Sequence, residues 1–129
     1  MINLYINERR HGDVTVLDLK GRLRVGGNTV ALHKSISCLA GENRLLILLN
    51  LADVLYIDSC GLGELVAGQI SLENKGGKMK LVGLTQPLRE LLTVTRLLTV
   101  FDIYEKETDA IQDLVDQISR SEKPRLAFV

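Results

Sequence analysis

The sequence predicts an α/β fold: a mixed β-sheet of about five strands with about four α-helices packed against it. Segments with strand character alternate along the chain with segments of helical periodicity, an order typical of sheets covered by helices. Residues 45–49 are apolar at every position, which predicts a central strand covered on both faces. The 129 residues are enough for one domain with its own core and too few for two.

The first part of the chain has the pattern of a β-hairpin. Apolar and polar residues alternate from Ile2 to Asn7, and this period of two predicts a strand with one wet face. The tripeptide His11-Gly12-Asp13 indicates a turn, and residues 14–19 predict the second strand. Gly21 and the pair Gly26-Gly27 interrupt the backbone pattern after it.

Four helices follow from capping signals and apolar periodicity. Asn28 can cap the first, and the second follows a turn at residues 58–61. Pro87 sits early in the third, where its missing N–H costs little, and Thr108 or Asp109 begins the fourth. The expected buried faces are Leu32, Ile36 and Leu39; Leu62, Leu65, Val66 and Ile70; Leu88, Leu91, Leu92 and Thr95; and Ile111, Leu114, Val115 and Ile118.

Two more strands are expected at residues 79–84 and 100–104. We expect residues 1–120 to form a single domain. Residues 121–129, which include Pro124, are expected to form a flexible C-terminal tail.

Composition excludes several classes of protein. Lysine and arginine number 16 and so do the acids, and this balance counts against direct nucleic-acid binding. No run of roughly 18 apolar residues predicts a membrane span, and the charged N-terminus lacks the apolar core of a signal peptide. Cys38 and Cys60 have no CxxC or metal spacing, so we expect reduced thiols in a cytoplasmic protein. His11 and His33 are expected at the surface and not as metal ligands.

The common signatures of enzymes are missing from the sequence. Gly76-Gly77-Lys78 is followed by Met79 and has no glycine at the spacing of a phosphate loop, and Val66 stands where a GxGxxG pattern would end. Neither GxSxG nor HExxH occurs. Ser59 has no histidine nearby in the sequence to activate it as a nucleophile. We therefore expect no catalytic residue, no metal and no cofactor.

The junction at residues 55–63 carries the most specific chemistry. It leads from a strand directly into a helix, and its small residues allow a tight turn and a close approach by another molecule. Asp58 or Ser59 would cap the helix, and a cap is one complete interpretation of the pattern. The other is a phosphorylation switch at Ser59, because a helix start tolerates a phosphate whose charge would repel a partner.

The segments LLILLNL, YIDSCGLG, KMKLVGL, QPLRELL and VFDIY occur in an order that resembles the STAS domain family. The likeness covers about residues 3–118 and is closest to the bacterial anti-sigma factor antagonists. Residues 58–63, Asp-Ser-Cys-Gly-Leu-Gly, are similar to the family motif D-S-[ST]-G-[LV]-G. Cys60 departs from this motif, and Arg24 stands where many members carry an aspartate.

The resemblance implies a partner switch. The unphosphorylated antagonist would bind an anti-sigma factor serine kinase and release the sigma factor; phosphorylation of Ser59 would end the complex and a serine phosphatase would reset it. The implied contact surface includes the loop at residues 21–27. Its candidate residues are Asp58, Ser59, Cys60, Gly61, Leu62 and Arg24. The chain would be a monomer or weak homodimer.

Three alternatives remain at this point. The chain could be a STAS subunit of a transporter or stress-sensing complex, acting as an interaction module without phosphorylation. It could bind or weakly hydrolyse a nucleotide, although it lacks a phosphate loop. It could also form a homodimer through the small residues Gly63, Ala67, Gly68 and Ser71.

Overall fold

The computed structural model describes the backbone of residues 4–23 and 27–127, with side chains for residues 4–23 and 31–117. The described part contains five strands and four helices and confirms the predicted α/β class. The elements in chain order are β1 (Leu4–His11), β2 (Val14–Leu23), α1 (Gly27–Gly41), β3 (Leu46–Ile57), α2 (Ser59–Asn74), β4 (Lys78–Val82), α3 (Gln86–Val94), β5 (Asp102–Tyr104) and α4 (Glu107–Ala127).

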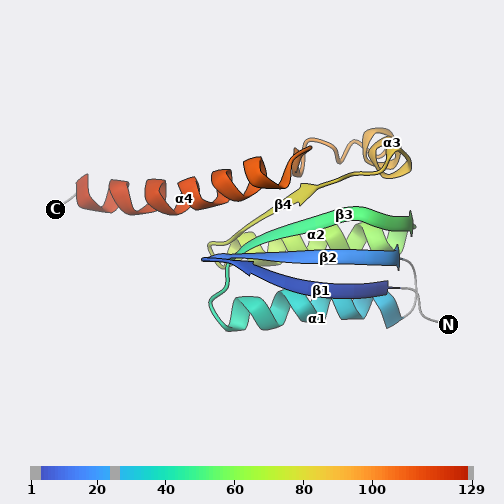
Figure 1. The fold of residues 1–129 in the computed structure, drawn as a ribbon, viewed down its shortest axis with the longest axis horizontal. Helices are drawn as coiled ribbons and strands as arrows, with labels where there is room; N and C mark the ends of the chain where they lie inside the picture. Colours follow the sequence, from blue (N-terminus) through green and yellow to red (C-terminus); the bar gives the residue numbers. More distant parts are fainter. Residues whose placement is uncertain (1–3, 24–26, 128–129) are drawn as a thin grey trace.

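The strands lie in the sheet in the same order as in the chain, β1-β2-β3-β4-β5. β1 and β2 form the expected antiparallel hairpin, and the remaining neighbours are parallel. Crossovers between parallel strands are almost always right-handed. Because each new strand is added on the same side, the crossover helices α1, α2 and α3 should lie on one face of the sheet. In Figure 1, α2 lies behind β2 and β3, and α1 lies alongside β1 at the lower edge of the sheet.

The main core lies between the sheet and these three helices. It includes Leu17 and Leu19 from β2, Ile47 and Leu49 from β3, and side chains of α1, α2 and α3. The run at residues 46–49 is buried on both faces, which confirms β3 as the central strand. Close packing of this aliphatic core supplies the dominant stabilisation of the domain.

Helix α4 covers part of the opposite face and forms a second, smaller core. Ala110 and Leu114 of α4 pack on the first residues of β2 and β3 and on β4. The strand residues of this core are Val14, Val16, Leu46, Leu48 and Val82. The helix therefore covers the beginning of β2 and β3, and the carboxyl ends of these strands carry no helix on that face among the described residues (Figure 1).

The observed burial of the helix side chains differs from several predictions. Leu32, Ile36 and Leu39 are buried as expected, but Ile70 is 53% exposed. Gln69 is buried in its place, because its Nε2 donates to the carbonyl oxygen of Val100 at 2.5 Å. Five more side chains depart from their expected burial: Val66, Leu91 and Ile111 are half-buried, and Thr95 and Val115 are exposed. The side chain of Ile118 lies outside the described residues.

Element boundaries also differ from the predictions. β2 continues past Gly21, which adopts φ 113° beside a shift in the register with β3. α1 begins at Gly27, so Asn28 lies inside the first turn and not at the cap. β3 is one strand of 12 residues, and α4 continues through Pro124 to Ala127, beyond the expected end of the domain at residue 120. The domain boundaries and the flexibility of residues 121–129 stay predictions.

Candidate functional site at the start of helix α2

Asp58 connects β3 to α2 and caps the helix. Its backbone is extended, with φ −109° and ψ −175°, and its carboxylate accepts a hydrogen bond from the Gly61 N–H at 2.9 Å. This bond satisfies one of the free N–H groups at the helix start. The Asp58 N–H donates to the carbonyl oxygen of Leu23 at 3.2 Å, which ties the junction to the end of β2. Of the two predicted caps, Asp58 and Ser59, the structure selects Asp58.

Gly61 allows the helix start to approach β2 closely. A Cβ at this position would lie 2.2 Å from the carbonyl oxygen of Leu23 and 2.8 Å from its carbonyl carbon. Both atoms belong to the backbone, so they cannot be displaced as a flexible side chain can. Only glycine fits without moving either β2 or α2. The space left by the missing side chain of Gly61 is therefore occupied by the chain's own β2. A close approach by another molecule at this junction stays a prediction.

The predicted site residues divide into an exposed pair and a buried pair. Ser59 and Cys60, the first two residues of α2, are exposed, whereas Gly61 and Leu62 are buried and Asp58 is half-buried. Leu62 is 6% exposed and belongs to the main core. The accessible side chains are thus the Ser59 hydroxyl and the Cys60 thiol, and Leu62 anchors the helix beneath them.

The chemistry available at Ser59 follows from its position. Its hydroxyl lies in the first turn of α2, where free N–H groups and the helix dipole favour negative charge. The Asp58 carboxylate is already engaged with the Gly61 N–H. A phosphate on Ser59 would therefore find a favourable dipole together with one adjacent carboxylate. Arg24, the remaining predicted site residue, lies outside the described residues.

Other predicted features lie away from this junction. His11 is exposed, and His33 has its Nδ1 3.7 Å from a carboxylate oxygen of Glu64. The described residues contain no group of three or more acidic, histidine or cysteine residues that could hold a metal ion. None of the described helices is both long and apolar enough to cross a membrane. Gly68 packs against Ile36 of α1, where an added Cβ would lie 2.8 Å from the Ile36 Cδ1 atom, so part of the small-residue face is covered within the chain.

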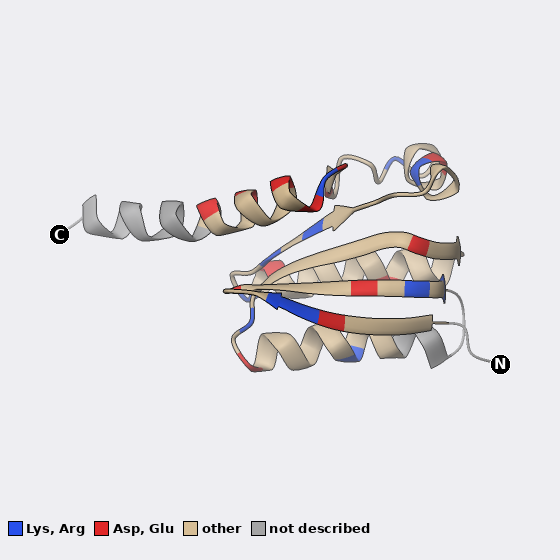
Figure 2. Cartoon of the chain, in the orientation of Figure 1, with Lys and Arg blue, Asp and Glu red and all other residues tan. Residues whose placement is uncertain are grey.

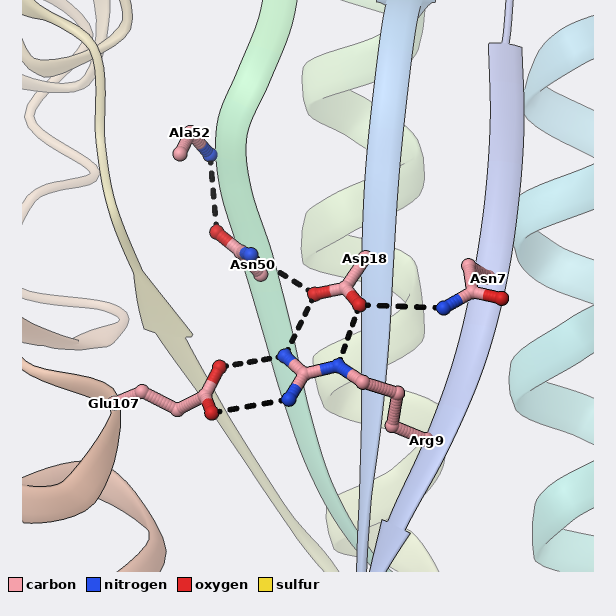
Figure 3. A network of polar contacts seen from close by, with 6 residues as sticks. All are labelled: Asn7, Arg9, Asp18, Asn50, Ala52 and Glu107. Carbon is pink, nitrogen blue, oxygen red and sulfur yellow. Dashed lines mark hydrogen bonds and ion pairs between the residues drawn. The ribbon is translucent and has the colours of Figure 1, made fainter.

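A polar network on the other face of the sheet was not predicted (Figure 3). The Arg9 guanidinium donates two hydrogen bonds to Asp18, at 2.6 and 2.9 Å, and two to Glu107 of α4, at 2.6 and 3.1 Å. Asn50 donates to Asp18 at 2.8 Å and accepts from the Ala52 N–H at 3.2 Å. The network joins β1, β2, β3 and α4 with paired, charge-assisted bonds.

The network changes the acidity of its members. Hydrogen bonding to Arg9 lowers the pKa of Asp18 to about 2, and hydrogen bonding to Arg9 also lowers the pKa of Glu107. The bonds to both carboxylates raise the pKa of Arg9. Each shift favours the charged form, so the network is fully ionised at neutral pH. Alternating polar residues in β1 and β2 were the sequence signal, but the Glu107 partner lies 98 positions from Arg9.

Fold and site together define a small α/β domain that presents an exposed serine at the end of its central strand. The STAS domain family model matches residues 5–110, and the chain belongs to this family.

Proteins similar to this chain in sequence or in fold include anti-sigma factor antagonists. The anti-sigma F factor antagonist of Paenibacillus polymyxa is 26% identical over 113 residues, 88% of this chain and 97% of the relative. An anti-sigma factor antagonist from Mycobacterium paratuberculosis has a solved structure that superposes with a TM-score of 0.74. It is 21% identical, and the match covers 87% of this chain and 94% of that one. The phosphorylated form of SpoIIAA, a Bacillus cell fate determinant, superposes with a TM-score of 0.66 at 19% identity, over 84% of this chain and 98% of that one.

Proposed function

We propose that this protein is an anti-sigma factor antagonist switched by phosphorylation of Ser59. The observation that carries the proposal is the exposed Ser59 hydroxyl at the start of α2, within the motif at residues 58–63. In the unphosphorylated form the protein binds an anti-sigma factor serine kinase, and the sigma factor is released. The similarity to the Paenibacillus antagonist over nearly its whole length supports this assignment.

The phosphorylation step needs no catalytic group from this chain. The Ser59 oxygen attacks the γ-phosphorus of ATP in the kinase active site, ADP leaves, and the hydroxyl proton passes to a base of the kinase. The product carries about −1.5 to −2 charges at Ser59. One neighbour with the same fold, SpoIIAA, was solved in a phosphorylated form, which supports the proposal that such a domain accommodates the group.

The added charge would act on the partner more than on the fold. The start of α2 offers a favourable dipole, and Leu62 and Leu65 hold the helix in the core. A partner surface packed over Ser59 would have to desolvate the phosphate next to the Asp58 carboxylate. The complex would dissociate while the domain stays folded. A serine phosphatase would restore the binding form, and the protein would work in the cytoplasm as a binding module and not as a catalyst.

The decisive experiment incubates wild type and Ser59 variants with the anti-sigma factor kinase of the same organism and compares their labelling. We expect the kinase and ATP to label the wild-type protein and the Ser37→Ala control, and to leave Ser59→Ala unlabelled. Ser37 is the matched control because it is also an exposed helical serine, on α1. Ser59→Asp should weaken kinase binding by about 1–3 kcal/mol in a calorimetric titration, the scale of a misplaced charge or lost polar contact.

Two results would contradict the proposal. Equal labelling of Ser59→Ala and wild type would remove Ser59 as the phosphoacceptor. Unchanged kinase affinity of Ser59→Asp would favour an interaction module that works without phosphorylation, as in a transporter or stress-sensing complex. Circular dichroism should show that Ser59→Asp keeps the fold, since Asp58 supplies the cap.

A further inference from the structure

A group of exposed side chains lies on the uncovered face of the sheet, at the end where β3 leads into α2. We call it the sheet-end surface and define it as Tyr5, Lys20, Arg22, Asp53 and Leu55, which line one hollow of about 330 Å³. Leu55 is 75% exposed and Tyr5 58% exposed. Two large apolar side chains, both mostly exposed, thus line the same hollow together with charged residues.

The fold explains why this surface is open. α1, α2 and α3 pack on the opposite face, and α4 covers only the beginnings of β2 and β3. Tyr5 pairs with Lys20 across β1 and β2, and Lys20 pairs with Asp53 across β2 and β3. These residues thus form a row across three strands. Paired strand backbone sets the position of these residues, and their side chains are already exposed.

The surface extends toward α3 through a second hollow. Leu55 also lines a groove of about 210 Å³ together with Tyr56, Thr85, Pro87 and Leu91. Leu55 therefore stands as a ridge between two concave regions. Such a ridge fits a partner that places apolar side chains on either side of it.

The charges of the surface indicate the chemistry of the partner. Lys20 and Arg22 are exposed, and neither forms an ion pair within the part of the chain that the structure describes. Asp53 lies opposite Lys20 in the register and offsets part of its charge, whereas Arg22, opposite Tyr56, lies nearer the end of β3. An acidic side chain beside an apolar one complements this arrangement.

The surface is within reach of a partner bound at Ser59. Leu55 and Ser59 are four positions apart, which corresponds to at most about 14 Å of extended chain. A standard interface buries about 800 Å² on each partner, a patch about 30 Å across. A footprint of this size centred on Ser59 is wide enough to reach Leu55, if it also extends around the end of the sheet.

We propose that the sheet-end surface is a second part of the kinase interface and receives an apolar side chain of the anti-sigma factor flanked by a carboxylate. The apolar side chain packs on Leu55 and Tyr5, and the carboxylate pairs with Arg22 and Lys20. The inference rests on the proposed function, because the anti-sigma factor is the partner that brings Ser59 and Leu55 into one footprint. Leu55 contributes affinity that phosphorylation does not regulate directly.

Calorimetric titration of the anti-sigma factor kinase with single variants tests this surface. Leu55→Ala should weaken binding about tenfold, as truncation of an apolar anchor does. Ile70→Ala is the matched control, because Ile70 is a 53% exposed apolar residue later in α2, and it should bind as wild type does. Arg22→Gln should slow association and flatten its salt dependence, whereas Lys34→Gln, at an exposed lysine on α1, should change neither.

The outcomes separate this inference from the proposed function. Suppose that wild type binds the kinase and that Leu55→Ala and Arg22→Gln bind it as tightly as wild type does. The sheet-end surface is then not part of the interface, whereas the proposed phosphorylation switch at Ser59 stands. If wild type does not bind the kinase, the proposed function fails, and so does the proposal that the anti-sigma factor occupies the sheet-end surface. Sedimentation velocity of the free protein adds one more outcome: self-association that Leu55→Ala abolishes would make the surface a contact between copies of this chain and overturn the proposal. Leu55→Ala should leave the thermal midpoint unchanged, so lost binding would not reflect unfolding.

Discussion

Gly61 shows how one residue positions the candidate switch. The Gly61 N–H satisfies the cap carboxylate of Asp58, while the missing side chain leaves room for the Leu23 carbonyl. The two contacts hold the start of α2 against the ends of both β2 and β3. The backbone of Ser59 therefore occupies a defined position, and its side chain is exposed at the start of the helix.

Replacing this glycine should be costly. In Gly61→Ala the new Cβ would overlap the Leu23 backbone at 2.2 Å, so the strand end or the helix must shift. We expect a loss of about 1–3 kcal/mol in the free energy of unfolding, measured by urea denaturation. Gly63→Ala is the control, because nothing lies within 4 Å of its added Cβ. That change should be neutral or stabilise the helix by up to about 1 kcal/mol. Equal effects of the two substitutions would show that the close approach does not constrain the helix start.

At the scale of elements, α4 depends on both apolar and ionic contacts. Ala110 and Leu114 bury its apolar side, and Glu107 in its first turn pairs with Arg9 of β1. A second set of contacts lies nearby: Lys80, 3% exposed, donates to Asp102 at 2.9 Å and lies over the Tyr104 ring, whose hydroxyl bonds to Asp113 of α4. Burial opposes the charge on Lys80, but its bonds to Asp102 and Tyr104 outweigh this effect and raise its pKa.

Removing the Arg9 guanidinium should loosen α4 selectively. Arg9→Met keeps most of the side-chain length but leaves Asp18 and Glu107 without their shared partner. We expect a loss of about 1–2 kcal/mol, a range reduced because the three side chains are partly exposed. Hydrogen exchange should increase in α4 more than in α2.

Arg10→Met provides the control for this change. Arg10 pairs with Glu8 and Glu42 in a more exposed setting, so its loss should cost less than about 0.5 kcal/mol. A uniform increase of exchange over the whole chain in Arg9→Met would contradict a specific role of the network in docking α4.

Local sequence patterns predicted the elements well where the apolar residues follow a clear pattern, either an unbroken run or a regular helical spacing. The all-apolar run at residues 45–49 placed β3 in the centre, and the spacing of Leu32, Ile36 and Leu39 placed the buried face of α1. Prediction failed for Ile70 because Gln69 finds a carbonyl partner in a distant segment, which periodicity cannot reveal. It could not choose between Asp58 and Ser59, since both residue types cap helices and only backbone geometry decides.

At the scale of the whole molecule, the charges balance and mix. The sequence holds 16 residues of each sign. In Figure 2 both signs occur on β1 and β2, whereas the described part of α4 carries only acidic residues. Against such a background, a local group such as Lys20 and Arg22, or a phosphate on Ser59, changes the nearby potential substantially.

Acid should destabilise the domain in a defined range of pH. The folded pKa of Asp18 is about 2, below the ordinary value of 3.8, so the folded state binds this proton less tightly than the unfolded state. The stabilisation is complete above about pH 4 and is lost as the pH falls toward 2. Its size is about 1–2 kcal/mol after allowance for partial exposure.

The measurement is the urea midpoint as a function of pH, in wild type and Asp18→Asn. The variant removes the titrating group, so its stability should fall less steeply than that of wild type between pH 4 and 2. Parallel curves for the two proteins would show that Asp18 is not linked to folding.

The order of the strands has a consequence for how the protein assembles. Each strand lies beside its predecessor in the chain, so no strand must wait for a later one to fill a gap between two others. On the ribosome, the sheet can grow one strand at a time as the chain emerges, beginning with the hairpin and gaining a core once α1 and β3 have joined it. The second core is completed last, because its cover is α4. Until that helix has been synthesised, Val14, Val16, Leu46 and Leu48 remain an exposed apolar strip, and the nascent chain is most prone to aggregation at that stage.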